Sequence, residues 1–238
     1  MTVLPRVTLS FLLLIFAGAL NSQSFDLDTV LGQIIDTYGG EENLRKLDSQ
    51  IQEWDVVALM GNRHGTDVRT IRTPDQLKVE LTYPGKKETR IVNGEASHFI
   101  FSGASAQVAN KPQRDAMRLQ LMRLYSPLVL RDRLDRLTLT VKGESFMLTL
   151  LERGVRVDYV VNTDNWRIES VLGSLPVDGS AMHFLTEYSD FKFRDGVLVH
   201  ERENKFAGGV NTAVLKLRRI TLDAELKDAD FLPGKDVI

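Results

Sequence analysis

The first regular pattern of apolar and polar positions in the chain is helical and begins after residue 25. Apolar side chains recur there as on one face of an amphipathic helix: Leu27, Val30, Leu31, Ile34, Ile35 and Tyr38. Asp26 can cap the start of this helix, and Gly39-Gly40 is expected to end it. A second short helix is predicted from Glu41 to Leu47.

From Ile51 onward the period of the pattern changes to two, which is typical of strands with one apolar face. Trp54 and Val56 alternate with Glu53 and Asp55, and the same alternation returns in later segments: Leu77–Tyr83, Phe146–Leu150, Val155–Val161 and Met182–Tyr188. Turn signals such as Pro84-Gly85 and Asn93-Gly94 separate the segments. The pattern predicts a mainly β fold with some α, built on an antiparallel meander of about ten strands that forms a sandwich or barrel.

One later segment, Pro112 to Tyr125, has helical spacing within the series of strands. Pro112 suits a first helical turn because it has no N–H to lose there, and Pro127 disfavours continuation of the helix. Asp115 and Arg123 are expected on the far side of an apolar stripe formed by Met117, Leu121 and Leu124. So short a helix is marginal alone in water, and we expect it to lie over an apolar cavity as a movable lid.

The amino terminus has the layout of a secretory signal peptide. Arg6 is the only charged side chain among the first 24 residues, and the apolar run Val7–Leu20 follows it. This run is shorter than the roughly 20 apolar residues that a membrane span needs. We therefore predict a signal peptide at 1–24, cleavage between Ser22 and Phe25, and a single domain at 25–238 that is soluble in the periplasm or another extracytoplasmic space. An uncleaved membrane anchor is the less favoured alternative.

Composition narrows the classes of function. The chain contains no cysteine, which excludes a disulfide framework, a thiolate metal site and a lipidated cysteine. The formal net charge of -2 offers no basic excess for binding nucleic acid. Hydrophobic residues make up 43% of the chain, enough for a sizeable core.

The sequence offers few residues arranged for catalysis. No serine elbow, phosphate-binding loop or dinucleotide motif is present. Glu53 and Asp55 lie two apart on the polar face of a strand, where solvation explains them. The histidines show no short metal-ligand spacing: His64, His98, His183 and His200. We expect no catalytic residues, no metal and no cofactor, and a hydrolase is the least favoured of three functional hypotheses.

Several segments together resemble the periplasmic lipoprotein-carrier (LolA-like) superfamily, of the type that sorts outer-membrane lipoproteins. They are a helix followed by Gly-Gly-Glu-Glu, the strand motif Arg72–Leu81, the turn Asn93-Gly94-Glu95 and the closing segment Asp228–Pro233. The resemblance covers roughly Asp26 to Pro233. It implies a half-open antiparallel barrel, covered by the amino-terminal helix and a lid helix, that holds acyl chains during transfer between membranes.

The resemblance implies an apolar cavity beneath the lid residues Met117, Leu121 and Leu124. Combined with the strand alternation, it predicts these cavity residues: Trp54, Val56, Val79, Leu81, Phe99, Phe101, Phe146, Leu148, Tyr159 and Phe184. Three pairs of inward-facing residues, one pair on each of three strands, are expected to share one apolar interior: Trp54 and Val56, Val79 and Leu81, and Phe146 and Leu148. The expected partner is a lipid, a lipoprotein acyl chain or another hydrophobic ligand, with transient membrane contact. A protein-interaction module of the cell envelope is the alternative.

One position departs from the family pattern. Carriers of this family place an arginine directly before the proline of the strand motif, where it fastens the lid. Here Thr73 occupies that position and Arg72 precedes it. Because side chains alternate between the faces of a strand, Arg72 is expected to point the opposite way.

Overall fold

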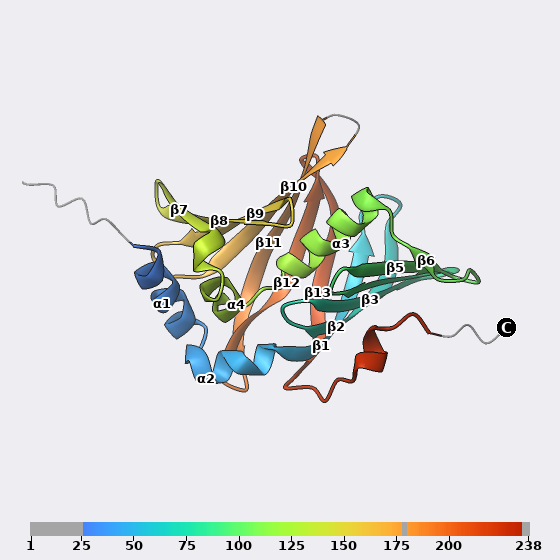
Figure 1. Cartoon of the computed structure of the whole chain (residues 1–238), viewed down its shortest axis with the longest axis horizontal. Coiled ribbons are helices and arrows are strands. Elements are labelled where there is room, and N and C mark those ends of the chain that lie inside the picture. Colours follow the sequence, from blue (N-terminus) through green and yellow to red (C-terminus); the bar gives the residue numbers. More distant parts are fainter. Residues whose placement is uncertain (1–25, 178–179, 235–238) are drawn as a thin grey trace, which may run out of the picture.

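The computed structural model describes residues 26–177 and 180–234 (Figure 1). The expected signal peptide at 1–24 and its cleavage site lie outside the described residues. Within the described part, no helix combines the length and apolar character needed to cross a membrane.

The described residues form one antiparallel sheet of thirteen strands, more than the ten or so expected. The strands are β1 Ser49–Ala58, β2 Arg63–Arg72, β3 Gln76–Tyr83, β4 Lys86–Asn93, β5 Ala96–Phe101, β6 Gln107–Val108, β7 Leu137–Lys142, β8 Ser145–Glu152, β9 Val155–Asn162, β10 Ile168–Val177, β11 Ser180–Arg194, β12 Val197–Ala207 and β13 Val210–Leu222.

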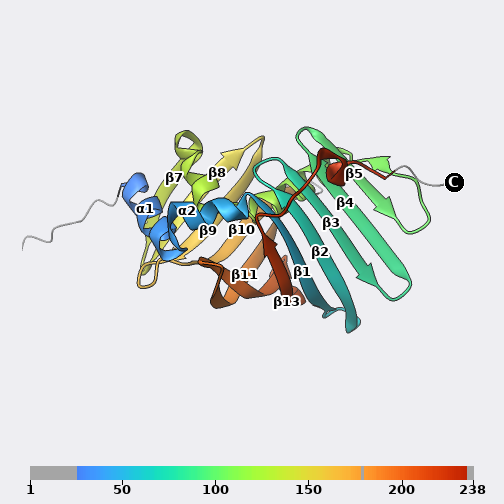
Figure 2. The same cartoon turned by 90° about the horizontal axis from the view of Figure 1, so that it is seen from below.

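The first and last strands meet at the middle of the sheet. Strands β1 to β6 follow one another outward to one edge, whereas β7 begins at the opposite edge and the chain returns until β13 pairs with β1 (Figure 2). The sheet is strongly curved but open, because its edge strands β6 and β7 do not pair with each other.

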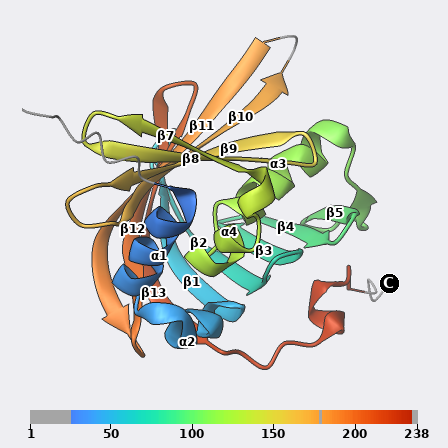
Figure 3. The same ribbon diagram turned by 60° about the vertical axis from the view of Figure 1, so that its left-hand side comes forward.

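Short helices complete the fold: α1 Leu27–Thr37, α2 Gly40–Leu44, α3 Lys111–Met122 and α4 Pro127–Arg131, with 3₁₀ turns at Arg45–Leu47, Leu134–Arg136 and Asp228–Phe231. The expected cap of α1 is confirmed, since Asp26 Oδ1 accepts a hydrogen bond of 2.8 Å from the Thr29 N–H. α1 packs on α2 and α4, and α2 also contacts β12 (Figure 3).

Helix α3 lies across the concave side of the sheet and contacts both halves of it. It packs against β4 and β5 from the first half and against β9 and β10 from the second. Asn110 and Gln113 form a capping box at its start. The close approach to β10 depends on Gly173, where a Cβ would lie 2.1 Å from the Leu119 side chain.

The prediction for the polar side of this helix was wrong. Asp115 is buried, with its carboxylate 2.6 Å from Lys111 Nζ. Arg123 directly follows α3 and turns toward the sheet, where its Nη2 donates a 2.8 Å hydrogen bond to the Phe184 carbonyl oxygen. Asp115 and Arg123 lie on the same side of the helix as Leu119 and Met122, which are buried. The side expected to face solvent is therefore covered as well.

The hydrophobic core divides into two clusters rather than the single interior expected. Val79, Phe146 and Leu148 belong to the main cluster, which also includes the apolar faces of α1, α3 and α4. Trp54 and Val56 form a separate small cluster with Leu215. Both Arg69 and Glu203 are buried side chains close to Trp54, and these polar groups explain why the apolar surface is interrupted.

Candidate functional site

Two adjoining cavities lie where the end of α3 meets the concave face of the sheet. The first has mostly apolar walls, including Leu124, Leu198 and Ile220, and holds about 80 Å³ of free space. The second holds about 200 Å³ and has walls of mixed character. The two cavities share Arg123, Leu124 and Tyr188. We call the second one the polar compartment, or polar cavity, because charged side chains such as those of Arg69, Glu203 and Lys205 line it beside apolar ones.

A third hollow, of about 270 Å³, lies along the other side of α3 against β4 and β5. Its apolar walls include Phe99, Phe101 and Met117. It shares Arg90 and Gln120, among others, with the second cavity. The second and third spaces therefore follow α3, and the first lies just beyond its carboxyl end.

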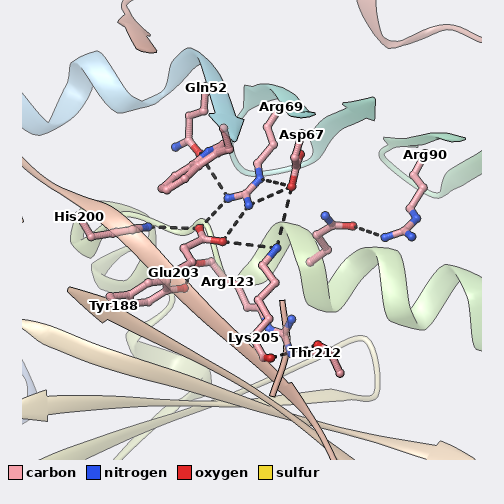
Figure 4. Close-up of polar contacts among 12 residues, drawn as sticks. Gln52, Asp67, Arg69, Arg90, Arg123, Tyr188, His200, Glu203, Lys205 and Thr212 are labelled. Atoms are coloured by element: carbon pink, nitrogen blue, oxygen red, sulfur yellow. Dashed lines mark hydrogen bonds and ion pairs between the residues drawn. The ribbon is translucent and has the colours of Figure 1, made fainter. Parts of the chain in front are cut away.

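The polar compartment is built around a buried ion pair between Arg69 of β2 and Glu203 of β12 (Figure 4). Two parallel hydrogen bonds join them, Nη1 to Oε1 at 2.7 Å and Nη2 to Oε2 at 2.8 Å. Each side chain is only 2% exposed. Asp67 Oδ2 accepts two more hydrogen bonds from Arg69, at 3.1 and 3.2 Å.

Strand register explains how these charges come to face the same interior. Asp67 and Arg69 are two apart on β2 and so share a face, as do Glu203 and Lys205 on β12. Arg69 lies directly opposite Gln52 on β1. Lys205 Nζ lies 3.4 Å from Glu203 Oε2 and 4.0 Å from Asp67 Oδ2, which extends the ion pair into a network of alternating charges.

Aromatic rings cover one end of this network. The Arg69 guanidinium lies 4.9 Å from the centroid of the Trp54 ring, and His200 stacks on the rings of both Trp54 and Tyr188. His200 Nε2 is 3.3 Å from Glu203 Oε1. His200 is therefore part of the buried site, whereas the sequence indicated only a scattered histidine.

The electrostatics keep the ion pair charged. Burial alone would raise the pKa of Glu203, but attraction to Arg69 and Lys205 holds that pKa well below its usual range. Burial and the nearby Arg69 lower the pKa of Lys205 despite the opposing attraction of Glu203. Since Glu203 is committed to Arg69 as an anion, the network is better suited to structure and binding than to proton transfer.

The Arg123 side chain borders both cavities and differs from the other cations of the site. Among the described residues it has no ion-pair partner, and its Nε has no hydrogen-bond partner. Its guanidinium lies 6.0 Å from the centroid of the Phe184 ring. Burial lowers the pKa of Arg123. In the same compartment the buried Thr186 hydroxyl also has no hydrogen-bond partner within the described structure.

Two tyrosines fasten the carboxyl end of α3 to the sheet. Tyr159 of β9 donates a 2.7 Å hydrogen bond to the Met122 carbonyl oxygen, and Tyr188 of β11 donates one of 3.1 Å to that of Arg123. Burial raises the pKa of both phenols, so both hydroxyls carry the proton that they donate. These bonds satisfy carbonyl groups that a helix end leaves unpaired.

The residues predicted for the cavity and lid are distributed over several spaces. Trp54, Tyr159 and Leu124 border the first cavity, Phe184 and Leu124 the second, and Phe99, Phe101 and Met117 the third hollow. The others border none of the three: Val56, Val79, Leu81, Phe146, Leu148 and Leu121. Phe101 is 41% exposed. A ligand-binding role for this set stays a prediction.

The residues set aside as weak enzyme candidates have structural partners. Glu53 and Asp55 lie near the Arg218 guanidinium, with Nη2 2.7 Å from a Glu53 carboxylate oxygen. His183 Nδ1 is 2.8 Å from the Ser174 hydroxyl oxygen. Across residues 26–177 and 180–234, histidine and carboxylate side chains form no group of three or more that could hold a metal ion.

Arg72, the residue that departs from the family pattern, contacts the carboxyl-terminal segment. Its Nη2 lies 3.0 Å from Asp228 Oδ1, and its guanidinium lies 5.1 Å from the centroid of the Phe231 ring. The inward-facing arginine of the same strand is Arg69. Arg72 therefore fastens the closing 3₁₀ turn, on the opposite face from the buried ion pair.

Solved structures with a similar architecture include proteins from three bacteria. A LolA superfamily protein from Nitrosomonas europaea has 15% identity and a TM-score of 0.59, with 88% of this chain and 98% of that chain covered. A domain named for outer membrane lipoprotein sorting, from Vibrio parahaemolyticus, has 8% identity and a TM-score of 0.54, with 85% and 94% covered. A DUF1329 family protein from Desulfovibrio piger has 9% identity and a TM-score of 0.50, with 86% and 96% covered.

The chain has a LolA-like fold, as the resemblance implied. Identities this low show the architecture alone. No protein-family model matches the chain, and no curated protein matches it in sequence.

Proposed function

We propose that this protein is an exported carrier or sensor that binds a hydrophobic ligand, such as a lipid or a lipoprotein acyl chain, between α3 and the concave face of the sheet. The observation that carries the proposal is the series of cavities that follows α3 where it crosses the sheet. Ligand sites of this kind are concave and largely apolar, with a few polar groups that fix orientation. The names of two fold neighbours, a LolA superfamily protein and a lipoprotein-sorting domain, are consistent with it.

In this proposal the curved sheet is a half-open barrel and α3 is its lid. The apolar cavity holds about 80 Å³, well below the roughly 300 to 1,000 Å³ of usual ligand pockets. An acyl chain needs more room, so binding requires α3 to move away from the sheet together with residues 123–127, which line this cavity. Tyr159 and Tyr188 hold that end of the lid closed by their hydrogen bonds to the Met122 and Arg123 carbonyl oxygens.

The cellular setting follows from the sequence. The amino-terminal pattern supports export, signal cleavage and a soluble domain from residue 25 onward, in the periplasm or another extracytoplasmic space. A carrier in that setting would contact membranes transiently and could transfer its ligand to an envelope protein.

Native mass spectrometry of the gently purified protein, followed by lipid extraction, tests the proposal. Bound lipid that survives purification is the expected result. A ligand-free protein that instead retains a stable protein partner would favour the interaction-module hypothesis and overturn this one.

A lid variant tests the role of α3. Leu121 is 4% exposed, and burying a leucine contributes about 1.5 to 3 kcal/mol, so Leu121→Glu is expected to detach the helix and reduce lipid retention while the sheet stays folded. Pro112→Glu is the matched control, because Pro112 is exposed, borders none of the three spaces and lies in the first turn of α3, where the same added charge is favourable. Global unfolding of Leu121→Glu by far-UV dichroism, without a specific change in lipid content, would show that the helix is ordinary core.

A further inference from the structure

We infer that the ligand is an anionic amphiphile, whose negatively charged head binds Arg123 in the polar cavity while its acyl chain occupies the apolar one. This inference rests on the proposed function and specifies its ligand. Its starting point is the position of Arg123, which borders both compartments.

The polar cavity has more cationic than anionic groups. Its walls carry Arg69, Arg90, Arg123 and Lys205 but a single carboxylate, that of Glu203. Most of these cations already have partners: Arg69 binds Glu203 and Asp67, Lys205 lies within 4.0 Å of the same two carboxylates, and Arg90 Nε lies 2.7 Å from Glu88 Oε1. Within the described structure, Arg123 is the cation of this cavity that has no ion pair.

A guanidinium in this setting is energetically costly. Arg123 is half-buried, with its Nε fully covered. Removing even part of a charge from water without a counter-charge disfavours the folded state. Arg123 donates one hydrogen bond, from Nη2 to the Phe184 carbonyl oxygen, and leaves its Nε unused. The planar guanidinium presents pairs of N–H groups that match a carboxylate or phosphate, so an anion would satisfy this group.

A second unused donor lies in the same cavity. The Thr186 hydroxyl on β11 is buried, borders the polar compartment and has no hydrogen-bond partner within the described structure. It could donate to a second oxygen of the same anionic head. Glu203 would not repel that head strongly, because its carboxylate is neutralised by the bidentate contact with Arg69.

The apolar part of the ligand has its place on the other side of Arg123. Leu124 follows Arg123 and borders both cavities, and Leu198 and Ile220 extend the apolar wall into the sheet. A molecule with an anionic head and a hydrocarbon tail would therefore match the boundary between the two compartments. A neutral hydrocarbon or ester would fill only one of them and leave Arg123 unpaired.

The test compares cis-parinaric acid, a fluorescent long-chain fatty acid, with its methyl ester, which keeps the chain but removes the charge. The wild-type protein is expected to bind the acid about 10-fold to 100-fold more tightly than the ester, the range of one charge-assisted hydrogen bond. Arg123→Gln keeps a donor for the Phe184 carbonyl and should remove this preference, and Arg123→Lys should restore part of it. Arg118→Gln is the matched control, since Arg118 lies in α3, which Arg123 directly follows, pairs with Glu95 and borders neither cavity.

The outcomes separate the two proposals. Equal binding of acid and ester by the wild type would keep the hydrophobic-ligand function and overturn the anionic-head inference. A preference for the acid that survives in Arg123→Gln would overturn the assignment to Arg123. If neither probe binds, both the inference and the proposed function fail. Displacement of the probe by lysophosphatidate, which has a phosphate head, or by palmitate, which has a carboxylate head, supports the inference. The stronger competitor shows which of the two heads the site prefers.

Discussion

The buried ion pair makes a sharp prediction for Glu203→Gln, which removes one negative charge and keeps the size of the side chain. The carboxylate of Glu203 accepts both hydrogen bonds of the Arg69 fork and lies 3.4 Å from Lys205 Nζ. Breaking a buried pair by removing one partner typically costs about 3 to 5 kcal/mol. Asp67 still binds Arg69 in the variant, so we expect a loss at the lower end of this range. The unfolding free energy at pH 7 should fall by about 3 kcal/mol.

The pH dependence of this loss follows from the direction of the pKa shift. The pKa of Glu203 in the folded protein lies well below the usual 4.5, so the charged form stabilises the fold above that value. The contribution is lost as pH falls through the folded pKa, when the carboxylate takes up a proton. The free-energy difference between wild type and variant should therefore be full near neutrality and shrink below about pH 4.

Urea unfolding followed by fluorescence, at pH 7 and in a series of more acidic buffers, measures this difference. Glu53→Gln is the matched control, because Glu53 pairs with Arg218 at the surface and such a pair contributes about 1 kcal/mol or less. A Glu203→Gln variant no less stable than Glu53→Gln at pH 7 would refute the reasoning. A loss that does not change with pH would show that packing rather than charge accounts for it.

Two further predictions concern how the helices are held. Tyr188→Phe should lower the unfolding free energy by about 1 kcal/mol, the usual value of one hydrogen bond, and speed amide exchange in α3, since its hydroxyl donates to the Arg123 carbonyl oxygen. Unchanged exchange would contradict the role of this bond in holding the lid. Gly39→Ala should destabilise by more than about 3 kcal/mol, because Gly39 has φ +112° and a Cβ there would lie 2.0 Å from the Gly196 carbonyl oxygen. Gly40→Ala is the control, because Gly40 has φ +82° but open space around it, and it should cost about 1 to 2 kcal/mol. If thermal unfolding shows equal losses for the two variants, the contact with Gly196 does not account for the effect at Gly39.

Apolar periodicity was a sound guide where buried strand positions carry aliphatic side chains. It marked β1, β3, β8 and β9, while Asp26 marked the start of α1 and Pro112 the first turn of α3. It missed strand β2, whose buried positions include Asp67, Arg69 and Ile71. A strand with charged groups on its inner face has no apolar alternation to detect, and this is one reason why the strand count was too low.

The buried charge network was missed for the same reason. Asp67-x-Arg69 and Glu203-x-Lys205 each place opposite charges two residues apart, which is the spacing of one strand face. Such pairs usually lie in solvent, and only the pairing of distant strands shows that these two face each other. Opposite charges two residues apart in each of two strands were the available signal. They indicate a buried network only when the order of the strands in the sheet is known.

Helix α3 shows a different limit. Its start was predicted to within one residue, but it ends at Met122 rather than Tyr125, and the side on which Arg123 lies was predicted wrongly. An isolated helix beside one surface has a polar far side, whereas α3 is enclosed by two halves of a curved sheet. Helical periodicity alone cannot reveal a second covering surface.

The pairing of β1 with β13 determines how this protein must fold. Hairpins such as β2–β3 and β8–β9 join neighbours in sequence and can form early, whereas the central pairing unites distant ends of the chain and must wait for both halves. Arg69 belongs to the first half and Glu203 to the second, so before the halves dock each has only the partner on its own strand, Asp67 for Arg69 and Lys205 for Glu203. Docking in the wrong register would leave Arg69 and Glu203 without each other. The ion pair therefore favours the correct register of the two halves, and the cavities beside α3 are complete only once the halves have docked.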